Sequence, residues 1–330
     1  MTFQIRINMR TIMVCVTMIC LMVVGCNVAV TNTAPVADQT KVHVWGRRGL
    51  DPGQFNKPRA IAVSPDDELF IVDKLGRIQV FDCEGNYLRE WRTPLIDQGK
   101  PCGLTFHSSG LLMVADTHYF RILFYTVNGE LVDPKTIGGI NGRRNGEFGF
   151  VTDVVEDANG DFFVSDYGDY DRIQKFDANG EFVSGWGGHG SDDMQFLRPQ
   201  SLAIDQRNRL WVADSCNHRI QIFDVSTDTP KLVKSIGAQG NEPGQLKYPY
   251  SIWLNDDETF YVCELGNHRV QKMTFEGKSL GCFGGPGKGV GEFDQPWAIV
   301  IDSQGTMHML DTYNHRVQSF RFEEVASFPE

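Results

Sequence analysis

Six acidic residues along this chain each stand a few positions before an arginine, and Ile or Val follows each arginine. The pairs are Asp73 with Arg77, Asp116 with Arg121, Asp166 with Arg172, Asp214 with Arg219, Glu264 with Arg269 and Asp311 with Arg316. A carboxylate beside a guanidinium can serve acid–base chemistry, or it can form a charge-assisted pair that fixes a loop. An active site is needed only once, so six copies favour the structural role.

The arginines also measure a repeat, because successive ones lie 44, 51, 47, 50 and 47 residues apart. A period in the forties is typical of repeat architectures. Most copies hold a Gly-x-Phe or Gly-x-Leu turn and a proline, and each continues with short apolar runs separated by polar turns such as Asn179-Gly180. Four short strands per copy, without a helical stretch, predict a four-stranded antiparallel blade. Six copies therefore predict an all-β fold, a six-bladed β-propeller.

The two ends of the repeat region complement each other. The last copy stops after its third strand near Phe322, whereas residues 42–46 form a strand with no copy before it. We therefore expect the N-terminal strand to complete the last blade, which removes an open sheet edge. The propeller is predicted to span residues 41–322, and residues 323–330 are predicted to be a C-terminal tail.

Three copies carry Asn-His before Arg-Ile/Val-Gln, at residues 217–221, 267–271 and 314–318. These segments, with their period, resemble the NHL-repeat family of six-bladed propellers over about residues 41–322. Blades one to three depart from the motif, with Leu75-Gly76, Tyr119-Phe120 and Tyr170-Asp171 in place of Asn-His. The family includes protein- and RNA-binding modules, extracytoplasmic sensors and the peptidylglycine alpha-amidating lyases. The asparagine and histidine residues are predicted to stabilise loops.

The first strand of each propeller blade lines the central channel, so the residue after the proline is expected to face the channel mouth. Aligning the copies places these residues in that ring: Arg59, Cys102, Thr152, Gln200, Tyr250 and Trp297. The next position is small in five copies but is Asp153 in the third, and Arg59 is one candidate partner for it. The ring predicts a site for a small ligand or a peptide terminus. The alternative is a mouth that holds only water.

In the amidating lyases, histidines that follow such prolines in alternate blades hold a catalytic zinc. Neither alternate set of the ring contains histidine here, and one thiol does not replace three imidazoles. The resemblance therefore implies the fold without the zinc chemistry, and we predict no metal, cofactor or catalytic residue. The longer loop of the third copy adds Tyr167, Asp169 and Tyr170 as candidate contact residues, with an ordinary solvated loop as the alternative.

The first 25 residues are predicted to be a signal peptide. Arg6 and Arg10 precede an apolar run from Thr11 to Val24, which as a helix spans about 21 Å, less than the roughly 30 Å of a membrane core. Val-Val-Gly-Cys resembles the bacterial lipobox, which implies lipid attachment at Cys26, and residues 26–40 read as a polar tether. A transmembrane anchor is the alternative. The sequence thus predicts an extracytoplasmic, membrane-anchored lipoprotein.

The formal net charge of −11 argues against nucleic acid as a partner, because phosphate binding depends on lysine and arginine. Five cysteines follow Cys26, at irregular spacing and with no Cys-x-x-Cys, which argues against a disulfide framework or a zinc knuckle. We therefore predict a non-catalytic binding or scaffold module for a protein or small ligand. A zinc-dependent lyase similar to the amidating lyases is the first alternative, and an RNA-binding module is the second.

Overall fold

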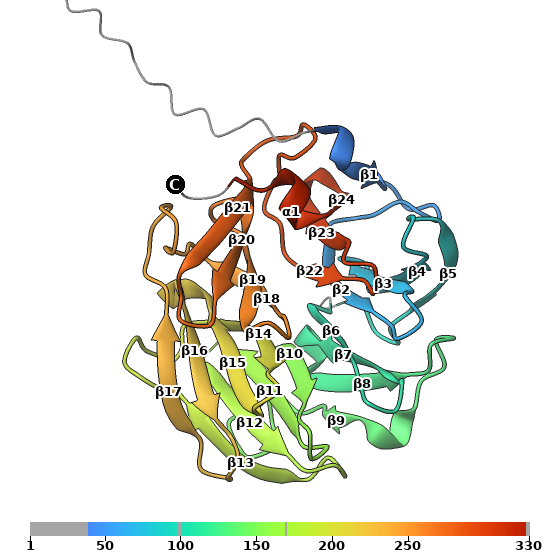
Figure 1. Ribbon diagram of the computed structural model, residues 1–330. Coiled ribbons are helices and arrows are strands. Elements are labelled where there is room, and N and C mark those ends of the chain that lie inside the picture. The colour runs from blue at the N-terminus through green and yellow to red at the C-terminus, as the bar shows by residue number, and fades with distance from the viewer. Residues whose placement is uncertain (1–38, 98–100, 169, 328–330) are drawn as a thin grey trace, which may run out of the picture. The chain divides into compact units, whose positions relative to one another are not determined.

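The computed structural model describes residues 39–97, 101–168 and 170–327, and this part of the chain forms six antiparallel sheets of four strands each (Figure 1). The six-bladed propeller predicted from the repeat is confirmed. Within blades one to five the strands follow sequence order from the channel to the rim.

The strands of the first three blades have the following bounds. Blade one has β2 (Pro58–Val63), β3 (Leu69–Asp73), β4 (Arg77–Phe81) and β5 (Tyr87–Arg92). Blade two has β6 (Gly103–Phe106), β7 (Leu112–Asp116), β8 (Arg121–Tyr125) and β9 (Ile137–Gly138). Blade three has β10 (Phe150–Glu156), β11 (Phe162–Tyr167), β12 (Arg172–Phe176) and β13 (Phe182–Gly187).

The last three blades follow the same plan. Blade four has β14 (Pro199–Ile204), β15 (Arg209–Asp214), β16 (Arg219–Asp224) and β17 (Lys231–Ile236). Blade five has β18 (Pro249–Leu254), β19 (Thr259–Glu264), β20 (Arg269–Thr274) and β21 (Ser279–Gly284). Blade six has β22 (Ile299–Ile301), β23 (Met307–Asp311), β24 (Arg316–Phe320) and β1 (His43–Trp45). Short 3₁₀ turns lie at Gln39–Lys41, Thr117–Tyr119, Asp133–Lys135, Ser215–Asn217 and Thr312–Asn314.

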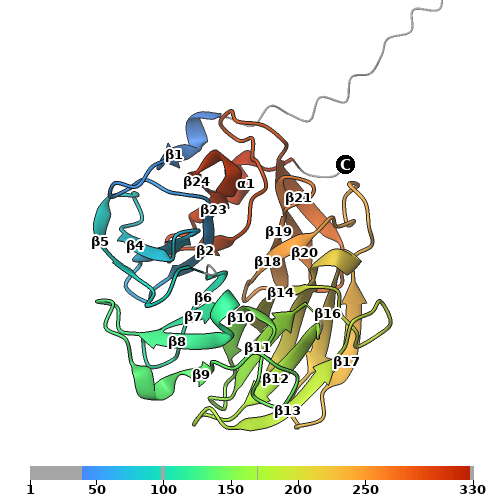
Figure 2. The same ribbon diagram turned by 180° about the vertical axis from the view of Figure 1, so that it is seen from behind.

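The sixth blade joins the two ends of the fold. β1 pairs antiparallel with β24, with Trp45 opposite Val317. The blue N-terminal strand lies beside the red C-terminal strands in two views that differ by a rotation of 180° (Figures 1 and 2). The prediction that the N-terminal strand completes the last blade is confirmed.

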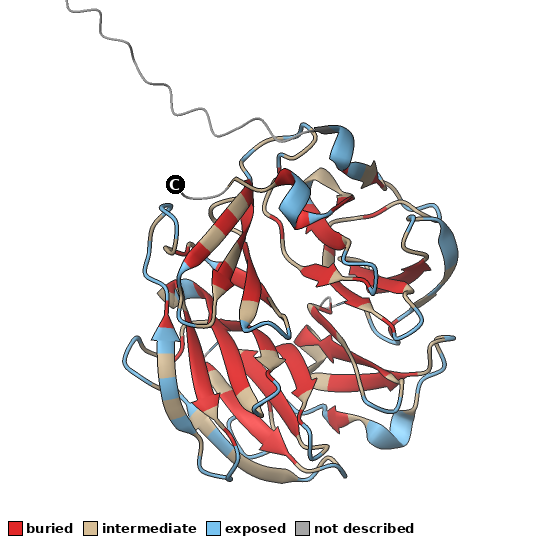
Figure 3. Ribbon diagram, viewed as in Figure 1, coloured by how far each residue is buried: buried red, intermediate tan, exposed pale blue. Residues whose placement is uncertain are grey.

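Burial follows position within the blade. Every residue of β3, β4 and β7 is buried, whereas β5 and β17 on the rim alternate between exposed and partly covered residues (Figure 3). The middle strands are covered on both faces by the neighbouring blades, so second strands such as β3 and β7 are almost entirely apolar, while the rim strands keep a solvated face.

All six acid–arginine pairs are ion pairs, with N–O distances of 2.6 to 3.3 Å, and every one of the acids has a fully buried side chain. In blade four, Arg219 Nε donates to Asp214 at 2.8 Å, and its Nη2 donates to two carbonyl oxygens of the loop that enters the blade. The Gln221 side chain donates to one of the same carbonyls, that of Gln195. The pairs therefore fix the entry loops, and their structural role is confirmed.

The three histidines of the Asn-His motif connect neighbouring blades. The Nδ1 atoms of His218, His268 and His315 accept backbone N–H groups at 3.1 to 3.2 Å from Tyr248, Gln295 and Lys57, each at the entry of the next blade. Burial lowers the pKa of His218 and His315, which keeps these rings neutral and able to accept. These contacts confirm that the histidines stabilise loops.

Residues 322–327 pack against blade five rather than extending from the fold. The short helix α1 (Phe322–Val325) buries Phe322 against the ring of Tyr261, and Ser327 exchanges backbone hydrogen bonds with Cys282 of β21. The apolar side chains at positions 322 and 325 explain this packing, because both are buried.

Some predicted features lie outside the described residues. These are the signal peptide, Cys26, nearly all of the tether, Asp169 and the last three residues. Among the helices that the structure describes, none has the length and apolar character needed to cross a membrane.

Candidate binding site at the channel mouth

Five of the six predicted ring residues line one small cavity of about 50 Å³, together with Asp153. The five are Arg59, Cys102, Gln200, Tyr250 and Trp297. Thr152 does not line it, because its hydroxyl is buried and bonds to the Pro199 carbonyl at 2.6 Å and to Ser165. The ring thus forms a shared surface, while Thr152 serves the contact between blades three and four.

The guanidinium of Arg59 lies over an aromatic ring of this mouth. Its guanidinium carbon is 4.8 Å from the centre of the Trp297 ring, and Trp297 in turn lies 5.5 Å from the Tyr250 ring. Arg59 Nη1 donates to Cys102 Sγ at 3.6 Å. A guanidinium held against a ring keeps its edge available for hydrogen bonds, because its π-face is the part in contact.

Arg198 is a second cation at the mouth that the sequence reasoning missed. Its guanidinium lies 4.8 Å from the ring of Tyr167 and 5.5 Å from that of Tyr250, and its Nε donates to Gln200 Oε1 at 3.2 Å. Asp171 accepts the backbone N–H of Arg198 at 2.8 Å and also contacts His189. Neither Arg198 nor Arg59 has an ion pair with a carboxylate among the described residues.

Arg198 shares a backbone conformation with three other residues at the blade entries. Residues just before the blade-entry prolines adopt positive φ angles: Lys57 54°, Arg198 60°, Tyr248 51° and Gln295 47°. Non-glycine residues adopt this left-handed region rarely. A search of the position before the proline, as well as the one after it, would have found Arg198.

Burial keeps the aromatic hydroxyls of the mouth neutral. It raises the pKa of Tyr250 to about 12 and also raises that of Tyr167, and the nearby Arg198 opposes both shifts. The mouth therefore combines two cations with neutral aromatic groups in a protein whose net charge is negative. This combination suits an anionic or carboxylate group attached to an apolar body.

Asp153 lies deeper in the channel and does not pair with Arg59, so that candidate partnership is wrong. Its two carboxylate oxygens accept the backbone N–H groups of Val154 and Leu202, each at 2.9 Å. Asp153 also borders a wider cavity of about 290 Å³, which is lined mainly by apolar side chains of the first strands. Backbone groups satisfy the acid, so the guanidinium is not needed there.

Burial raises the pKa of Asp153 to about 7, which makes its contribution to stability depend on pH. The folded protein holds a proton that the unfolded chain releases near 3.8, so stability from this group is lost as pH rises through about 7. An asparagine side chain does not ionise, so we expect the unfolding free energy of Asp153→Asn, relative to that of wild type, to be higher at about pH 8 than at about pH 5. Urea unfolding of both proteins at the two pH values measures this, with exposed Asp66→Asn as the control. An equal difference at both pH values would contradict it.

The loop candidates separate into two places. Tyr167 reaches the mouth through its contact with Arg198. Tyr170 does not: its ring lies 5.1 and 5.2 Å from the guanidinium carbons of Arg143 and Arg172, in a separate cavity of about 360 Å³ in blade three. Asp169 lies outside the described residues.

The mouth does not offer the ligands that a zinc lyase of the resembled type needs. All eight histidines of the chain lie in the described part, and none of them lines the mouth cavity. The cavity contains one thiol, Cys102, and one buried carboxyl, Asp153. The residues present therefore do not fit a three-histidine zinc site there.

Comparisons with known proteins agree with the fold. Residues 196–223 match the family model of the NHL repeat. The chain is 30% identical over 217 residues to peptidyl-glycine alpha-amidating monooxygenase B of Xenopus laevis, covering 62% of this chain and 23% of that protein. It is 30% identical to a Caenorhabditis elegans protein named a probable peptidyl-alpha-hydroxyglycine alpha-amidating lyase, covering 51% of each. The chain thus spans about half or less of these relatives' length.

Among solved structures, the fold resembles an auxiliary nutrient binding protein from Bacteroides thetaiotaomicron, with a TM-score of 0.63. The two chains are 15% identical, and the match covers 84% of this chain and 75% of the other. At this identity the likeness concerns the fold.

Proposed function

We propose that this six-bladed propeller, which carries an NHL repeat, is a non-catalytic binding module that holds an anionic group of a protein segment or small ligand at its channel mouth. One observation carries the proposal: the guanidinium groups of Arg59 and Arg198 lie against aromatic rings at the mouth, and neither guanidinium forms an ion pair with a carboxylate of the described residues. Two such guanidinium groups can each donate charge-assisted hydrogen bonds to an incoming carboxylate or phosphate.

The surrounding rings support an occupant with an apolar part next to its charge. Trp297, Tyr250 and Tyr167 form the wall against which the two arginines lie. Aromatic and arginine side chains are common anchors of binding surfaces. The cavity itself, at about 50 Å³, holds only a small group, so the rest of the occupant would lie over the mouth.

We further propose that the module is an extracytoplasmic lipoprotein anchored through Cys26. The basic start, the apolar run and the Val-Val-Gly-Cys segment support this. Lipid attachment would confine the binding module to a membrane surface without a spanning helix.

The amidating lyases remain the alternative activity, because two of the similar proteins carry that name or the related monooxygenase name. Release of an amidated peptide from a peptidyl-alpha-hydroxyglycine by the purified protein would establish the lyase. RNA binding is the second alternative, and a salt-sensitive RNA complex would establish it.

The binding proposal is tested by crosslinking the full chain in a bacterial host and identifying bound molecules by mass spectrometry. We expect the double variant Arg59→Ala/Arg198→Ala to retain the bound molecule about 10-fold less than wild type or worse, because a hydrogen bond to a charged group contributes about 1.5–3 kcal/mol. Arg207→Ala is the matched control, since Arg207 pairs with Glu258 at the surface and does not line the mouth.

Two outcomes would overturn the proposal. An unchanged set of bound molecules in the double variant would show that the mouth is not the binding surface. In the same cells, the Cys26→Ser protein is expected to be absent from the membrane fraction. If it stayed in the membrane fraction, the proposal of a lipid anchor at Cys26 would be wrong.

A further inference from the structure

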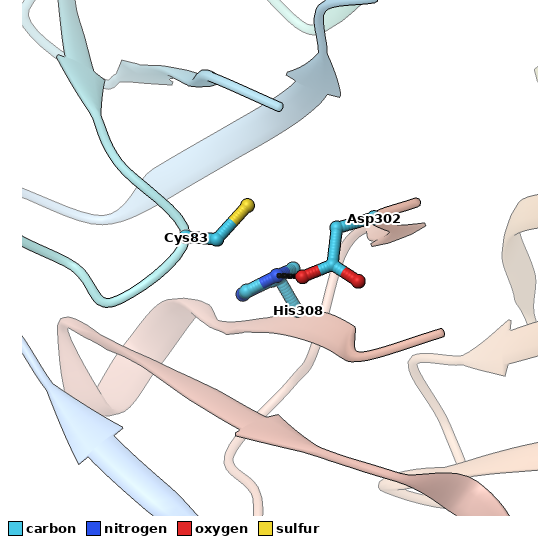
Figure 4. Close-up of side chains that lie close together, drawn as sticks. All are labelled: Cys83, Asp302 and His308. Carbon is cyan, nitrogen blue, oxygen red and sulfur yellow. Dashed lines mark hydrogen bonds and ion pairs between the residues drawn. The ribbon is translucent and has the colours of Figure 1, made fainter. Parts of the chain in front are cut away.

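Three side chains with metal-binding atoms meet at the junction between blades six and one, away from the channel mouth (Figure 4). Cys83 follows β4 of blade one, Asp302 follows β22 of blade six, and His308 lies in β23. Their sulfur, oxygen and nitrogen atoms all lie within 4.8 Å of one another. His308 and Asp302 are buried and Cys83 is half-buried, so one side of the group is open to solvent.

Hydrogen bonds hold the imidazole of His308 in place. Its Nδ1 lies 2.9 Å from Ser319 Oγ, and Ser319 Oγ also accepts the Trp45 indole N–H at 2.9 Å. Its Nε2 lies 3.3 Å from Asp302 Oδ2 and faces the group. Histidine ligands of metals characteristically have the other ring nitrogen hydrogen-bonded in this way, which fixes the ring orientation.

Two other blade junctions place aromatic rings at the equivalent positions. Blade four has Trp211 against Phe275 of blade five, with ring centres 4.5 Å apart, and blade five has Tyr261 against Phe322 of blade six, 5.0 Å apart. At the junction of blades six and one, histidine and cysteine occupy these places. The acid at this turn is not new, since Asp205 of blade four accepts the Trp211 indole N–H. The imidazole and thiol are therefore the specific additions, and they lie beside an acid that blade four also has at this turn.

We propose that Cys83 Sγ, Asp302 carboxylate oxygen and His308 Nε2 form a Zn²⁺ site. Thiolate, imidazole and carboxylate are the ligand types of zinc, and three protein ligands leave a fourth position for water. A thiolate ligand disfavours Mg²⁺ and Ca²⁺, which take oxygen ligands. Binding forms the zinc–sulfur bond and releases the thiol proton to solvent, while the imidazole proton moves to Nδ1, where Ser319 Oγ accepts it.

The site links the first blade to the last. Cys83 comes from one side of the ring closure, and Asp302 and His308 come from the other, with Ser319 and Trp45 behind them. A metal bound to the folded state and absent from the unfolded one stabilises the fold by mass action. Bound zinc would therefore stabilise the contact between blades six and one, independently of any ligand at the channel mouth.

The test is a zinc titration of the full chain, purified without a histidine tag and stripped with a chelator. We expect saturable binding of one Zn²⁺, a higher Tm with zinc, and a thiolate charge-transfer absorption when Co²⁺ replaces it. Cys83→Ser and His308→Gln are each expected to raise the Kd for zinc at least about 100-fold, and Ser319→Ala about 10-fold, because lost second-layer contacts cost about 10–100-fold.

Cys216→Ser is the matched control, since Cys216 is exposed and lies near the channel mouth. It is expected to leave the zinc affinity and the cobalt absorption unchanged. The proposal is overturned if wild type shows no zinc-dependent Tm increase and no thiolate absorption with Co²⁺, a result that needs no variant to fold. It is equally overturned if zinc binds but Cys83→Ser and His308→Gln bind it as tightly as wild type.

Discussion

Replacing Asp73 by alanine is expected to lower the free energy of unfolding by about 3–5 kcal/mol, because the buried Arg77 loses its nearest counter-charge and keeps only the partly exposed Glu90 carboxylate, 3.8 Å away. The side chains of Asp73 and Arg77 are both fully inaccessible to solvent, and their N–O distance is 3.0 Å. Asp73 also accepts the backbone N–H groups of Leu75 at 2.8 Å and Asn56 at 3.2 Å. The substitution therefore removes the nearest anion from a buried cation and the acceptor from two backbone donors.

Urea unfolding followed by circular dichroism measures this effect. Glu258→Ala is the control, because the Arg207–Glu258 pair is exposed and a surface pair contributes at most about 1 kcal/mol. Asp214→Ala offers a graded comparison, since 14% of the Arg219 side chain reaches solvent and part of the charge can be hydrated. A loss at Asp73 no larger than that at Glu258 would show that the buried pair does not hold the entry loop.

Trp45→Ala is expected to cost about 3–5 kcal/mol, as is usual for removing a buried tryptophan from a core. Trp45 is the inward-facing residue of the closing strand β1, with ring centres 4.9 Å from Phe81 and 6.0 Å from Phe55. Its indole N–H also donates to Ser319 at 2.9 Å. The substitution therefore weakens the packing between blades six and one and removes one of the hydrogen bonds to the Ser319 hydroxyl, while the contact with His308 remains.

Chemical unfolding again gives the measurement, and Leu88→Ala is the matched control on another rim strand. Leu88 is 44% exposed, so its removal is expected to change stability by no more than about 0.5 kcal/mol. Should Trp45→Ala behave like Leu88→Ala, the closing strand would contribute little to the stability of the ring.

The fold could be predicted from the sequence because each blade repeats the same short motifs. The acid–arginine pairs recur with a period set by the four-stranded blade, and their number equals the number of blades. The strand at residues 43–45 was recognisable because it has an apolar pattern and lies before the first repeat. Such features depend on short segments, which a single sequence displays directly.

The residues of the site were harder to predict, because their role depends on the direction in which each side chain points. Thr152 shares its alignment position with Arg59, yet its hydroxyl turns into a blade interface. Arg198 was missed because it precedes the blade-entry proline, whereas the ring was taken from the positions that follow the prolines. Cys83 and His308 lie far apart in the sequence and outside any cysteine motif, so only the closed ring brings them together.

The pairing of β1 with β24 also has a consequence for how the protein is made. Trp45 leaves the ribosome long before Ser319, its partner 274 residues away, so the sixth blade stays incomplete until synthesis is nearly finished. Contacts this distant in sequence form slowly, and an unpaired strand is prone to wrong associations while it waits. A chain that ends before β24 would therefore leave β1 as an unpaired strand that is prone to aggregation. In a circular permutant opened between two other blades, β24 and β1 would be synthesised one shortly after the other.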